Sequence, residues 1–459
     1  MVQLIRSKRL SARELLAAHL KQIERVNLKL NAIVTLVADR AAKAAFAADE
    51  LQAKGSPLGP LHGLPIAHKD LVNTKGILTT FGSPIFKDNI PTTNDLIVDR
   101  IQAAGAITIG KTNTPEFGAG SQTFNTVFGA TLNPYDTSKT CGGSSGGAAV
   151  SLASGMLPIA DGSDMGGSLR NPASFCNIVG FRPSIGRVPA PAAPFLWSTL
   201  STSGPMARST ADVALLLSAI AGPARNTPNS LPEPGSTFRQ PLARTFRGTR
   251  VAWFKNLNGN PFDARTLKVI AAQRQHFEQL GCIVEEAEPN FSGADFAFKT
   301  LRAWNSAVAH GELIRTHRTA YKYTLLKEVE DGLKLTGTDI ARAEQLHSQL
   351  WQSFQHFLAS YEYFILPTTQ LPAFDVKLPY PGEINGVKFD SYIDWMRSCW
   401  YISITGNPAI SVPAGFTPEG LPVGIQIVGR HNQDFGVLQI AHAYEQATHH
   451  ARRRPALAL

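Results

Sequence analysis

The sequence predicts an α/β fold in which a central β-sheet is covered by helices on both faces. Short apolar runs alternate with segments of helical periodicity along most of the 459 residues. Hydrophobic residues make up 43% of the chain and charged residues 17%, a balance that fills a large core and excludes a disordered chain. No internal repeat of about 20 to 50 residues is present, which argues against a repeat architecture.

The first half of the chain supplies five elements of this pattern. Ser11 and Glu14 have the spacing of a capping box, which predicts a helix whose apolar face continues to Ile23. The remaining elements expected here are a helix over 34–53, a buried strand over 64–69, a helix over 96–104 and a strand over 106–109.

The second half opens on a proline-rich stretch, residues 222–248, which we interpret as a surface excursion. Alternating elements follow it to the end of the chain, as the fold class requires. They are strands over 251–254, 282–286, 363–366, 409–412 and 423–428, helices over 261–280 and 435–448, and long helical patterns that fill about 294–360.

Composition also excludes several classes of protein. No run of about 18 or more apolar residues is present, and the first residues lack the apolar stretch of a secretory signal. Cys141, Cys176, Cys282 and Cys399 show no close pairing, so we expect neither a disulfide framework nor a zinc site. A cytoplasmic protein without a membrane partner fits these features best.

The net charge of +9 raises the question of nucleic-acid binding. The densest basic clusters, residues 244–250 and 452–454, are short and lack interleaved aromatic residues. We therefore expect a solvated basic surface and no nucleic-acid partner, with the chain acting as a monomer or homodimer on a small molecule.

Residues 105–112 match the phosphate-loop pattern G-x-x-x-x-G-K-[ST] letter for letter. A phosphate loop needs flexible chain between its glycines, so that bare N–H groups wrap the phosphate. Here Ile107, Thr108 and Ile109 favour an extended strand, and Pro115 prevents a helix from following at once. We interpret the segment as a strand followed by a turn.

Residues 142–146 fit G-x-S-x-G, the nucleophile elbow of α/β-hydrolases, with Ser144 as the nucleophile. An elbow follows an apolar strand, whereas residues 134–141 are polar. It also needs a histidine partner, and the sequence singles out none of the histidines downstream. A histidine-dependent esterase that uses Ser144 is therefore a remote alternative.

A third pattern joins two glycine-flanked serines to a lysine. Ser144 and Ser168 lie 24 residues apart, and Lys69 lies in an apolar strand 75 residues before Ser144. Glycines beside a serine let backbone N–H groups converge on one point, as an oxyanion hole requires. Burial of Lys69 would disfavour its ammonium form and make a neutral amine available as a base. Taken singly, each part also fits a tight turn, a helix cap or a lysine that reaches solvent.

Together these segments resemble the amidase signature family of serine hydrolases. The similar segments are residues 62–70, 142–147, 162–187, 203–208, 407–413 and 424–429. The resemblance covers nearly the whole chain. It implies a single amidase domain over 1–459, with a core signature region at about 60–220 and a variable substrate-cleft region at about 290–400. The implied fold is the amidase-signature α/β fold with a central mixed sheet.

The resemblance implies a Ser–cis-Ser–Lys triad that needs no metal and no cofactor. Lys69 would be the base, and Ser144 would be the bridging serine beside the substrate, following a cis peptide bond to Gly143. Ser168 would be the nucleophile that forms an acyl-enzyme. The reaction would be hydrolysis of a carboxylic amide.

The resemblance also implies a set of supporting groups. Backbone N–H groups of Met165, Gly166, Gly167 and Ser168 would form the oxyanion hole, and the Gly118 carbonyl would face the substrate. Ser145, Asp164 and Arg170 would support the site, or would only make hydrogen bonds within their loops. The sequence departs from the family pattern at Cys141, Ser163, Met165 and Asn177. These departures bear on substrate preference and leave the triad intact.

The substrate is less clearly indicated. Aromatic residues at 294–323 and 379–401 would favour an aryl or bulky amide, an aryl carbamate (urethane) or an ester, unless they are ordinary core residues. They are Trp304, Tyr321, Tyr323, Tyr380, Tyr392, Trp395, Trp400 and Tyr401. An aryl acylamidase or urethanase is therefore expected. The alternative is the glutaminase subunit of a tRNA-dependent amidotransferase, which the aromatic-rich, glycine-poor stretch at 294–323 makes less favoured.

Overall fold

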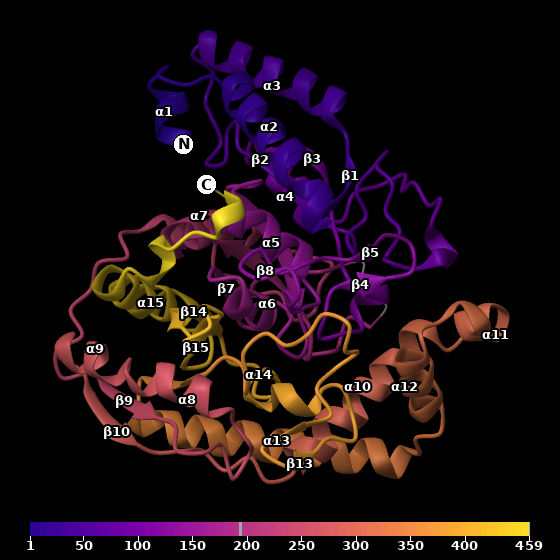
Figure 1. Cartoon of the computed structure of the whole chain (residues 1–459), viewed down its shortest axis with the longest axis vertical. Helices are drawn as coiled ribbons and strands as arrows, with labels where there is room; N and C mark the ends of the chain where they lie inside the picture. Colours follow the sequence, from indigo (N-terminus) through magenta and orange to yellow (C-terminus); the bar gives the residue numbers. More distant parts are fainter. Residues whose placement is uncertain (192–194, 459) are drawn as a thin grey trace.

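The structure is a computed structural model that describes residues 1–191 and 195–458. Its centre is a sheet of eight strands surrounded by helices (Figure 1). The strands are β6 Ile159–Asp164, β7 Val179–Arg182, β8 Thr202–Ala207, β9 Arg250–Trp253, β10 Ile283–Glu286, β11 Tyr363–Pro367, β14 Ala409–Phe416 and β15 Pro422–Gly429. They lie in the order β10-β9-β11-β15-β14-β7-β8-β6. Strand β9 pairs in parallel with β10 and β11, and the other neighbours pair antiparallel, so the sheet is mixed as predicted.

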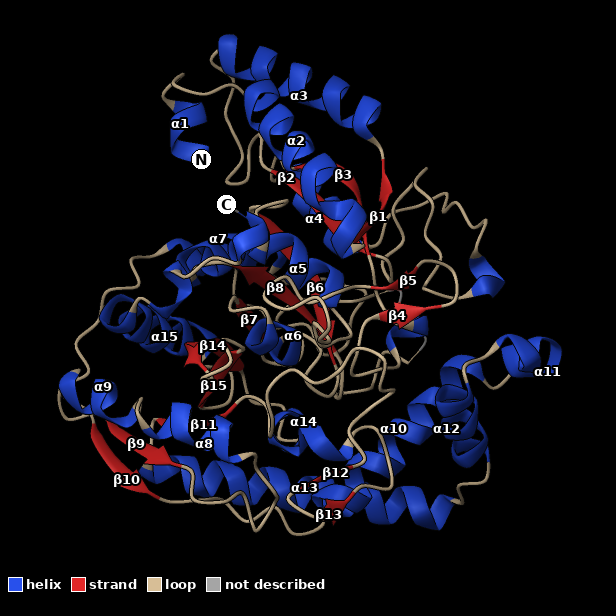
Figure 2. Cartoon of the chain, in the orientation of Figure 1, coloured by secondary structure: helices blue, strands red, loops and turns tan. Residues whose placement is uncertain are grey.

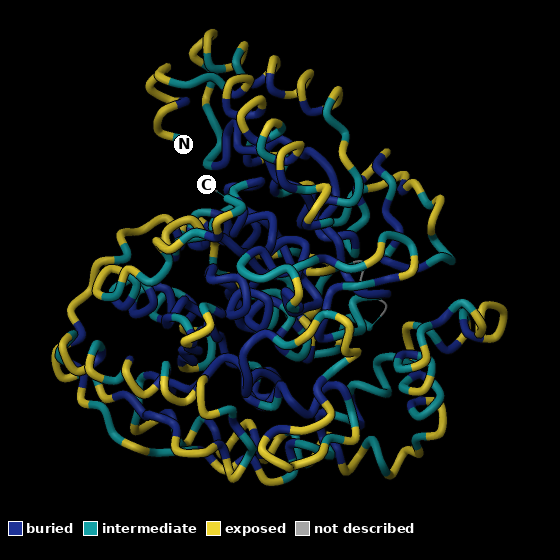
Figure 3. The backbone as a smooth tube through the Cα atoms, in the orientation of Figure 1, coloured by how far each residue is buried: buried dark blue, intermediate teal, exposed yellow. Residues whose placement is uncertain are grey.

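The middle of this sheet is covered on both faces. Every residue of β7, β11 and β15 is buried. Successive side chains of a strand point to opposite faces, so a fully buried strand has cover on each side. Figure 3 shows this buried centre with an exposed outer shell. The helices that pack around the sheet are α5 Gly146–Ala153, α6 Arg170–Phe175, α7 Thr210–Ile220, α8 Ala264–Ala271, α9 Arg274–Gln279 and α15 Asp434–Thr448.

A second, smaller sheet lies near the N-terminal helices, at the top of Figure 1 and Figure 2. Its strands are β1 Ile33–Leu36, β2 Pro65–Lys69 and β3 Ile107–Thr112, in the order β1-β3-β2. Strand β2 pairs in parallel with β3 and is therefore an edge strand. It also lies against β6 of the large sheet, which brings the two sheets together at Lys69. The helices around this sheet are α1 Val2–Arg6, α2 Ala12–Leu30, α3 Ala38–Ala53 and α4 Leu96–Ala103.

A third region is mostly helical and lies at the lower right of Figure 1. Helices α10 and α12 pack against each other, and α10 also packs against α13. The helices of this region are α10 Ala294–His310, α11 Leu313–His317, α12 Tyr323–Leu333, α13 Gly337–Ser360 and α14 Arg397–Ser403. Two short hairpins complete the fold, β4 Phe124–Asn125 with β5 Gly129–Ala130, and β12 Glu383–Ile384 with β13 Val387–Lys388.

Most predicted elements are confirmed, and the helical patterns over about 294–360 form the separate helices α10 to α13, but two helices have different boundaries. The predicted helix over 34–53 begins only at Ala38, because Ile33 to Leu36 pair with the central strand of the small sheet. The predicted helix over 261–280 begins at Ala264 and is interrupted after Ala271. There the Gln273 N–H donates to the Ile270 carbonyl three residues back, a tighter turn than that of an α-helix.

The rejected phosphate loop contains a strand, as the sequence predicts, but the strand continues beyond Ile109, where a turn was expected, to Thr112. Strand β3 includes Gly110, Lys111 and Thr112 of the motif, and all six of its residues are buried. The Lys111 amine donates to the Thr74 and Thr79 hydroxyls at 3.0 and 3.2 Å, so it is held within the protein. No helix among the described residues is long and apolar enough to cross a membrane.

Candidate active site

The centre of the site is Lys69, the last residue of edge strand β2. Its side chain is buried. The Lys69 Nζ lies 2.7 Å from Ser144 Oγ, 2.9 Å from Ser145 Oγ and 3.0 Å from Ser163 Oγ. Within the described part of the chain, Lys69 forms no ion pair with a carboxylate. A buried amine is thus surrounded by hydroxyl groups alone.

Burial determines which form of this lysine is available. Loss of hydration lowers the pKa of Lys69 to about 7, although the negative charges of Asp164 and Asp161 act in the opposite direction. A neutral amine has two N–H donors and one lone pair. With three hydroxyls around it, the neutral amine can donate to two of them and accept a proton from the third. The arrangement therefore suits a general base that acts on a serine hydroxyl.

Ser144 and Ser145 come from the glycine-rich loop that precedes α5. The Gly143–Ser144 peptide bond is cis, as predicted. A Cβ atom at Gly147 would lie 2.4 Å from the Asn113 backbone nitrogen, so only glycine permits this approach of the loop to the end of β3. The close contact holds both serines against the end of the neighbouring strand, where Lys69 lies.

Ser168 lies in the turn between β6 and α6, and a buried ion cluster fixes this turn. Asp164 accepts hydrogen bonds from Arg170 Nε at 3.0 Å and Nη2 at 2.9 Å, and Arg182 Nη1 lies 3.4 Å away. It also accepts from the backbone N–H groups just before and just after Ser168, at 2.8 and 3.1 Å. Burial alone would raise the pKa of Asp164, but the two guanidinium groups outweigh it and hold the pKa well below its usual range. The ionised carboxylate thus holds the backbone on both sides of Ser168.

One member of the predicted oxyanion hole has another role. The Gly167 N–H donates to Asp164 Oδ1, which removes it from the set of donors that could face a substrate. The Met165, Gly166 and Ser168 N–H groups have no acceptor among the residues that the structure describes. The sequence could not distinguish these four groups, because the direction of an N–H depends on the local turn.

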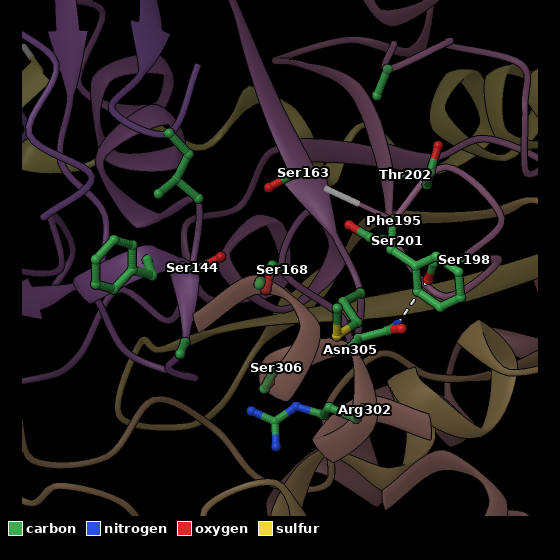
Figure 4. Close-up of a pocket in the computed structure, with 18 of the residues that line it drawn as sticks. Ser144, Ser163, Ser168, Phe195, Ser198, Ser201, Thr202, Arg302, Asn305 and Ser306 are labelled. Carbon is green, nitrogen blue, oxygen red and sulfur yellow. Dashed lines mark hydrogen bonds between the residues drawn. The ribbon is translucent and has the colours of Figure 1, made fainter. Parts of the chain in front are cut away.

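Ser144 and Ser168 line the same cavity (Figure 4). The Ser145 N–H donates to the Ser168 carbonyl oxygen at 3.2 Å and ties the two serine-bearing loops together. No hydrogen bond joins the Ser144 and Ser168 hydroxyls in the described structure, and the Ser168 hydroxyl faces the cavity without a protein partner there. Gly118 also lines this cavity, and its carbonyl accepts a hydrogen bond from the Gly120 N–H at 3.1 Å.

The cavity has a volume of about 370 Å³ and a largely apolar wall. Its apolar side chains include Leu71, Phe117, Met165, Phe195, Phe298 and Met396. Among the eight aromatic residues named from the sequence, all of them described, Tyr392 alone lines the cavity. Trp395 and Trp400 are fully buried in the core, and Tyr323 is 74% exposed. The cleft is therefore aromatic, but chiefly through phenylalanines that the sequence did not single out.

Charged groups of the cavity wall pair with one another. Arg302 forms an ion pair with Glu328 and donates to the Tyr392 hydroxyl. The Ser306 hydroxyl donates to Glu328 at 2.6 Å. Across the cavity, Asn305 donates to Ser198 at 2.8 Å (Figure 4). One end of the cavity is therefore polar, and there the positive charge of Arg302 is balanced by the negative charge of Glu328.

Sequence reasoning missed several residues around Lys69. Ser163 was read only as a departure from the family pattern, yet its hydroxyl is a direct partner of the amine. His68 and Asp161 form a buried pair beside the lysine, with His68 Nδ1 2.8 Å from Asp161 Oδ1. The signal for this pair was a histidine and an aspartate in two strands that are almost wholly buried, since buried charges occur in pairs.

The histidine-dependent alternative lacks its partner. No histidine side chain contacts the Ser144 or Ser168 hydroxyl in the described residues. His310 is the histidine of the cavity wall, but its Nδ1 lies 3.3 Å from the Tyr321 hydroxyl and its ring packs on Phe117 at 4.6 Å. The loop before Ser144 is not a strand either, so the elbow interpretation is not supported.

The chain also matches known proteins over nearly its whole length. Residues 14–438 match the protein-family model for Amidase. The chain is 34% identical over 467 residues to an acylamidase of Rhodococcus erythropolis, covering 98% of this chain and 95% of that protein. It is also 34% identical over 483 residues to a glutamyl-tRNA(Gln) amidotransferase subunit of Geobacillus kaustophilus, covering 99% and 97%. The crystal structure of a bacterial aryl acylamidase superimposes with a TM-score of 0.92 at 28% identity, covering 98% of this chain and 96% of that one.

Proposed function

The chain belongs to the amidase signature family, whose members are hydrolases of carbon–nitrogen bonds, and on this premise we propose that it hydrolyses aryl or bulky apolar amides through an acyl-enzyme on Ser168. The observation that carries the proposal is the buried Lys69 amine, 2.7 Å from the Ser144 hydroxyl, at the edge of an apolar cavity that Ser168 also lines. Its burial supplies a neutral base near pH 7, because the pKa of Lys69 is lowered to about 7.

The first half of the reaction moves one proton and forms one bond. Neutral Lys69 takes the Ser144 Oγ proton, and Ser144 takes the proton of Ser168 Oγ. Ser168 Oγ then attacks the substrate carbonyl carbon, and the negative charge moves to the carbonyl oxygen. The free N–H groups of the turn at Met165, Gly166 and Ser168 are the donors available to this oxyanion.

The second half returns the proton and releases two products. The Lys69 ammonium gives its proton through Ser144 to the amide nitrogen, and the C–N bond breaks as the neutral amine leaves. Water then loses a proton to the same relay and attacks the ester carbonyl on Ser168. The bond between the acyl carbon and Ser168 Oγ breaks, the relay returns the proton to Ser168 Oγ, and the carboxylic acid is freed. Protonation of the nitrogen matters most for amides, because an unprotonated amine is a poor leaving group. An aryl carbamate or ester presents a carbonyl to the same nucleophile.

The cavity wall supports an apolar or aryl substrate. Phe117, Phe298 and Met396 give aromatic and thioether surface, which packs well on a planar ring. The chain is equally identical to an acylamidase and to an amidotransferase component, so identity does not distinguish the two activities. Glutamine carries an ammonium and a carboxylate, each of which needs a charged partner when buried. The Arg302 and Glu328 side chains in the cavity wall are already paired with each other, which favours the uncharged aryl amide.

A fluorophosphonate probe with peptide mapping tests the nucleophile. We expect label on Ser168 in the wild type and none in Ser168→Ala. Label on Ser144 would overturn the assignment of the nucleophile.

Hydrolysis of an acetanilide, a short aliphatic amide, an aryl carbamate and glutamine by the same preparation tests the substrate class. A much higher kcat/KM for the short aliphatic amide would contradict the aryl preference, and glutamine hydrolysis that requires added subunits would favour the amidotransferase.

Unpaired cysteines at all four positions fit a cytoplasmic enzyme.

A further inference from the structure

Beside the catalytic lysine lies a buried pair that the proposed reaction does not use. His68 precedes Lys69 on β2, and Asp161 lies on β6 of the large sheet; both are no more than 1% exposed. His68 Nδ1 is 2.8 Å from Asp161 Oδ1, and Asp161 Oδ2 accepts the backbone N–H of Lys69 at 3.2 Å. Strand β2 is an edge strand, and alternate N–H groups of such a strand point away from its neighbour; the Lys69 N–H is one of these and needs an acceptor outside the small sheet. The Asp161 carboxylate is that acceptor.

The hydrogen-bond directions define the charge of the pair. The Gln102 amide donates to Thr108 Oγ1 at 3.1 Å, and the Asn94 amide donates to the Gln102 oxygen at 3.3 Å. His68 Nε2 lies 3.1 Å from the same Thr108 oxygen. Among the described residues this is the acceptor that remains for the Thr108 hydroxyl proton, so Nε2 accepts and Nδ1–H donates to Asp161. His68 is then neutral and Asp161 ionised, and the pair carries one negative charge.

This charge differs from the other charges packed around Lys69. Asp164, also on β6, is bound by the guanidinium groups of Arg170 and Arg182, which offset its charge. On the other side, Asp70 faces the Lys111 amine of β3, and the charges of these two groups oppose each other. The partners of Asp161 are a neutral imidazole and a backbone N–H. Asp161 thus differs from Asp164 in having no guanidinium bound to it, although its charge also acts on the Lys111 amine.

We propose that Asp161, oriented by His68, is a positioning residue for Lys69: it fixes the backbone of the lysine, and its negative charge acts together with that of Asp164 to keep the ammonium form available at higher pH. The inference rests on the proposed role of Lys69. Without this charge, burial would act against the ammonium with less opposition, and the lysine would be neutral at lower pH. The charge thus keeps the ammonium accessible, which the second half of the reaction needs in order to protonate the leaving amine.

The test is the pH dependence of kcat/KM for an anilide, together with the rate at which a fluorophosphonate labels Ser168. In Asp161→Asn the ascending limb of both profiles is expected about one pH unit lower than in the wild type. His68→Asn keeps an N–H donor near the position of Nδ1, so its limb is expected at the wild-type pH. Asp212→Asn removes an exposed carboxylate at the start of α7 and is the control for a change in overall charge.

Two outcomes would overturn the proposal. One is an Asp161→Asn limb at the wild-type pH, and the other is a His68→Asn limb that moves as far as that of Asp161→Asn. If Asp161→Asn does not fold, the double variant His68→Ile, Asp161→Leu removes both polar partners together and is expected to shift the limb in the same direction. Failure of the proposed function itself looks different, because then the wild type lacks the limb or Lys69→Ala keeps its activity.

Discussion

Two buried lysines lie near the ends of neighbouring strands of the small sheet, Lys69 as the last residue of β2 and Lys111 as the last but one of β3. Burial lowers the pKa of both, to about 7 for Lys69 and to about 8 for Lys111. Lys69 Nζ contacts three serine hydroxyls, and Ser144 among them lines the cavity. Lys111 Nζ instead donates to the Val72 carbonyl and to two threonine hydroxyls of the loop that follows β2. The same residue type at similar burial thus contacts the loop of the proposed relay in one place and a loop away from the cavity in the other.

The difference shows that burial alone does not make a lysine a catalytic base. A carbonyl oxygen has no proton to give, and the threonines around Lys111 do not line the cavity. The Ser144 hydroxyl has a proton and lies in a loop tied to Ser168. A perturbed pKa therefore marks both lysines as candidates, and the neighbouring atoms select between them.

Replacing each lysine by methionine is the strongest test of this comparison. Lys69→Met removes the only base of the proposed relay, and we expect kcat/KM for an anilide to fall by about 10³-fold or more. Lys111→Met leaves the relay intact, and at a temperature where both variants are folded its kcat/KM should stay within about tenfold of the wild type. Equal losses of kcat/KM in the two variants would mean that Lys69 has no catalytic role that Lys111 lacks.

Ser144→Ala tests whether the hydroxyl beside Lys69 carries the proton. We expect a loss of about 10²- to 10⁴-fold for an anilide, the range typical of general acid–base catalysis. The loss should be smaller for the matched aryl ester, whose leaving group needs no proton. The ratio of the two losses in kcat/KM is the measurement. A ratio near one would show that Ser144 does not protonate the leaving group. Ser145→Ala is the neighbouring control, since its hydroxyl contacts Lys69 but does not line the cavity.

The pH profile gives the next largest effect. The pKa of Lys69 is lowered to about 7, so the amine is protonated below this pH and has no lone pair. We expect kcat/KM to rise about tenfold per pH unit up to pH 7 and then to level off, with a loss of about 100-fold at pH 5. Circular dichroism at each pH controls for unfolding. Activity that is highest at pH 5 would exclude a neutral lysine as the base.

The stability of Lys111→Met addresses the other side of the comparison. This change leaves the Val72 carbonyl and the two threonine hydroxyls without their donor, and leaves buried Asp70 without a neighbouring cation. We expect the free energy of unfolding in urea to fall by about 3 kcal/mol. A variant as stable as the wild type would show that water replaces the amine without cost.

How far the sequence predicts this molecule can be judged from the same residues. Lys69, Ser144 and Ser168 were named from spacing and resemblance, because glycines beside serines and a lysine in an apolar strand leave a trace in the chain. The β-branched residues before Lys111 predict the strand that replaces the phosphate loop, but its end was expected at Ile109, whereas β3 continues through Lys111 to Thr112. The role of Ser163 and the engagement of the Gly167 N–H could not be predicted, because they depend on the packing of β2 against β6 and on the turn after Asp164. The cavity wall was only partly predictable, since Phe117 and Phe298 come from separate loops and helices that meet only in the folded chain.

The smallest effect is expected from Ser163→Ala, which removes one of the three hydroxyls around Lys69. The amine keeps Ser144 and Ser145 as partners, so the lysine stays in place, and the loss of one hydrogen bond costs about 1 kcal/mol. We expect kcat/KM to fall by about fivefold. The lost partner stabilises the ammonium, so the ascending limb should move slightly to lower pH. Thr79→Val is the matched change at Lys111 and should leave both kcat/KM and the limb unchanged. A loss of kcat/KM for Ser163→Ala as large as that for Ser144→Ala would instead place Ser163 in the path of the proton. Ser144 would then no longer be the one hydroxyl that transfers a proton, with Ser145 and Ser163 only holding the Lys69 amine in place.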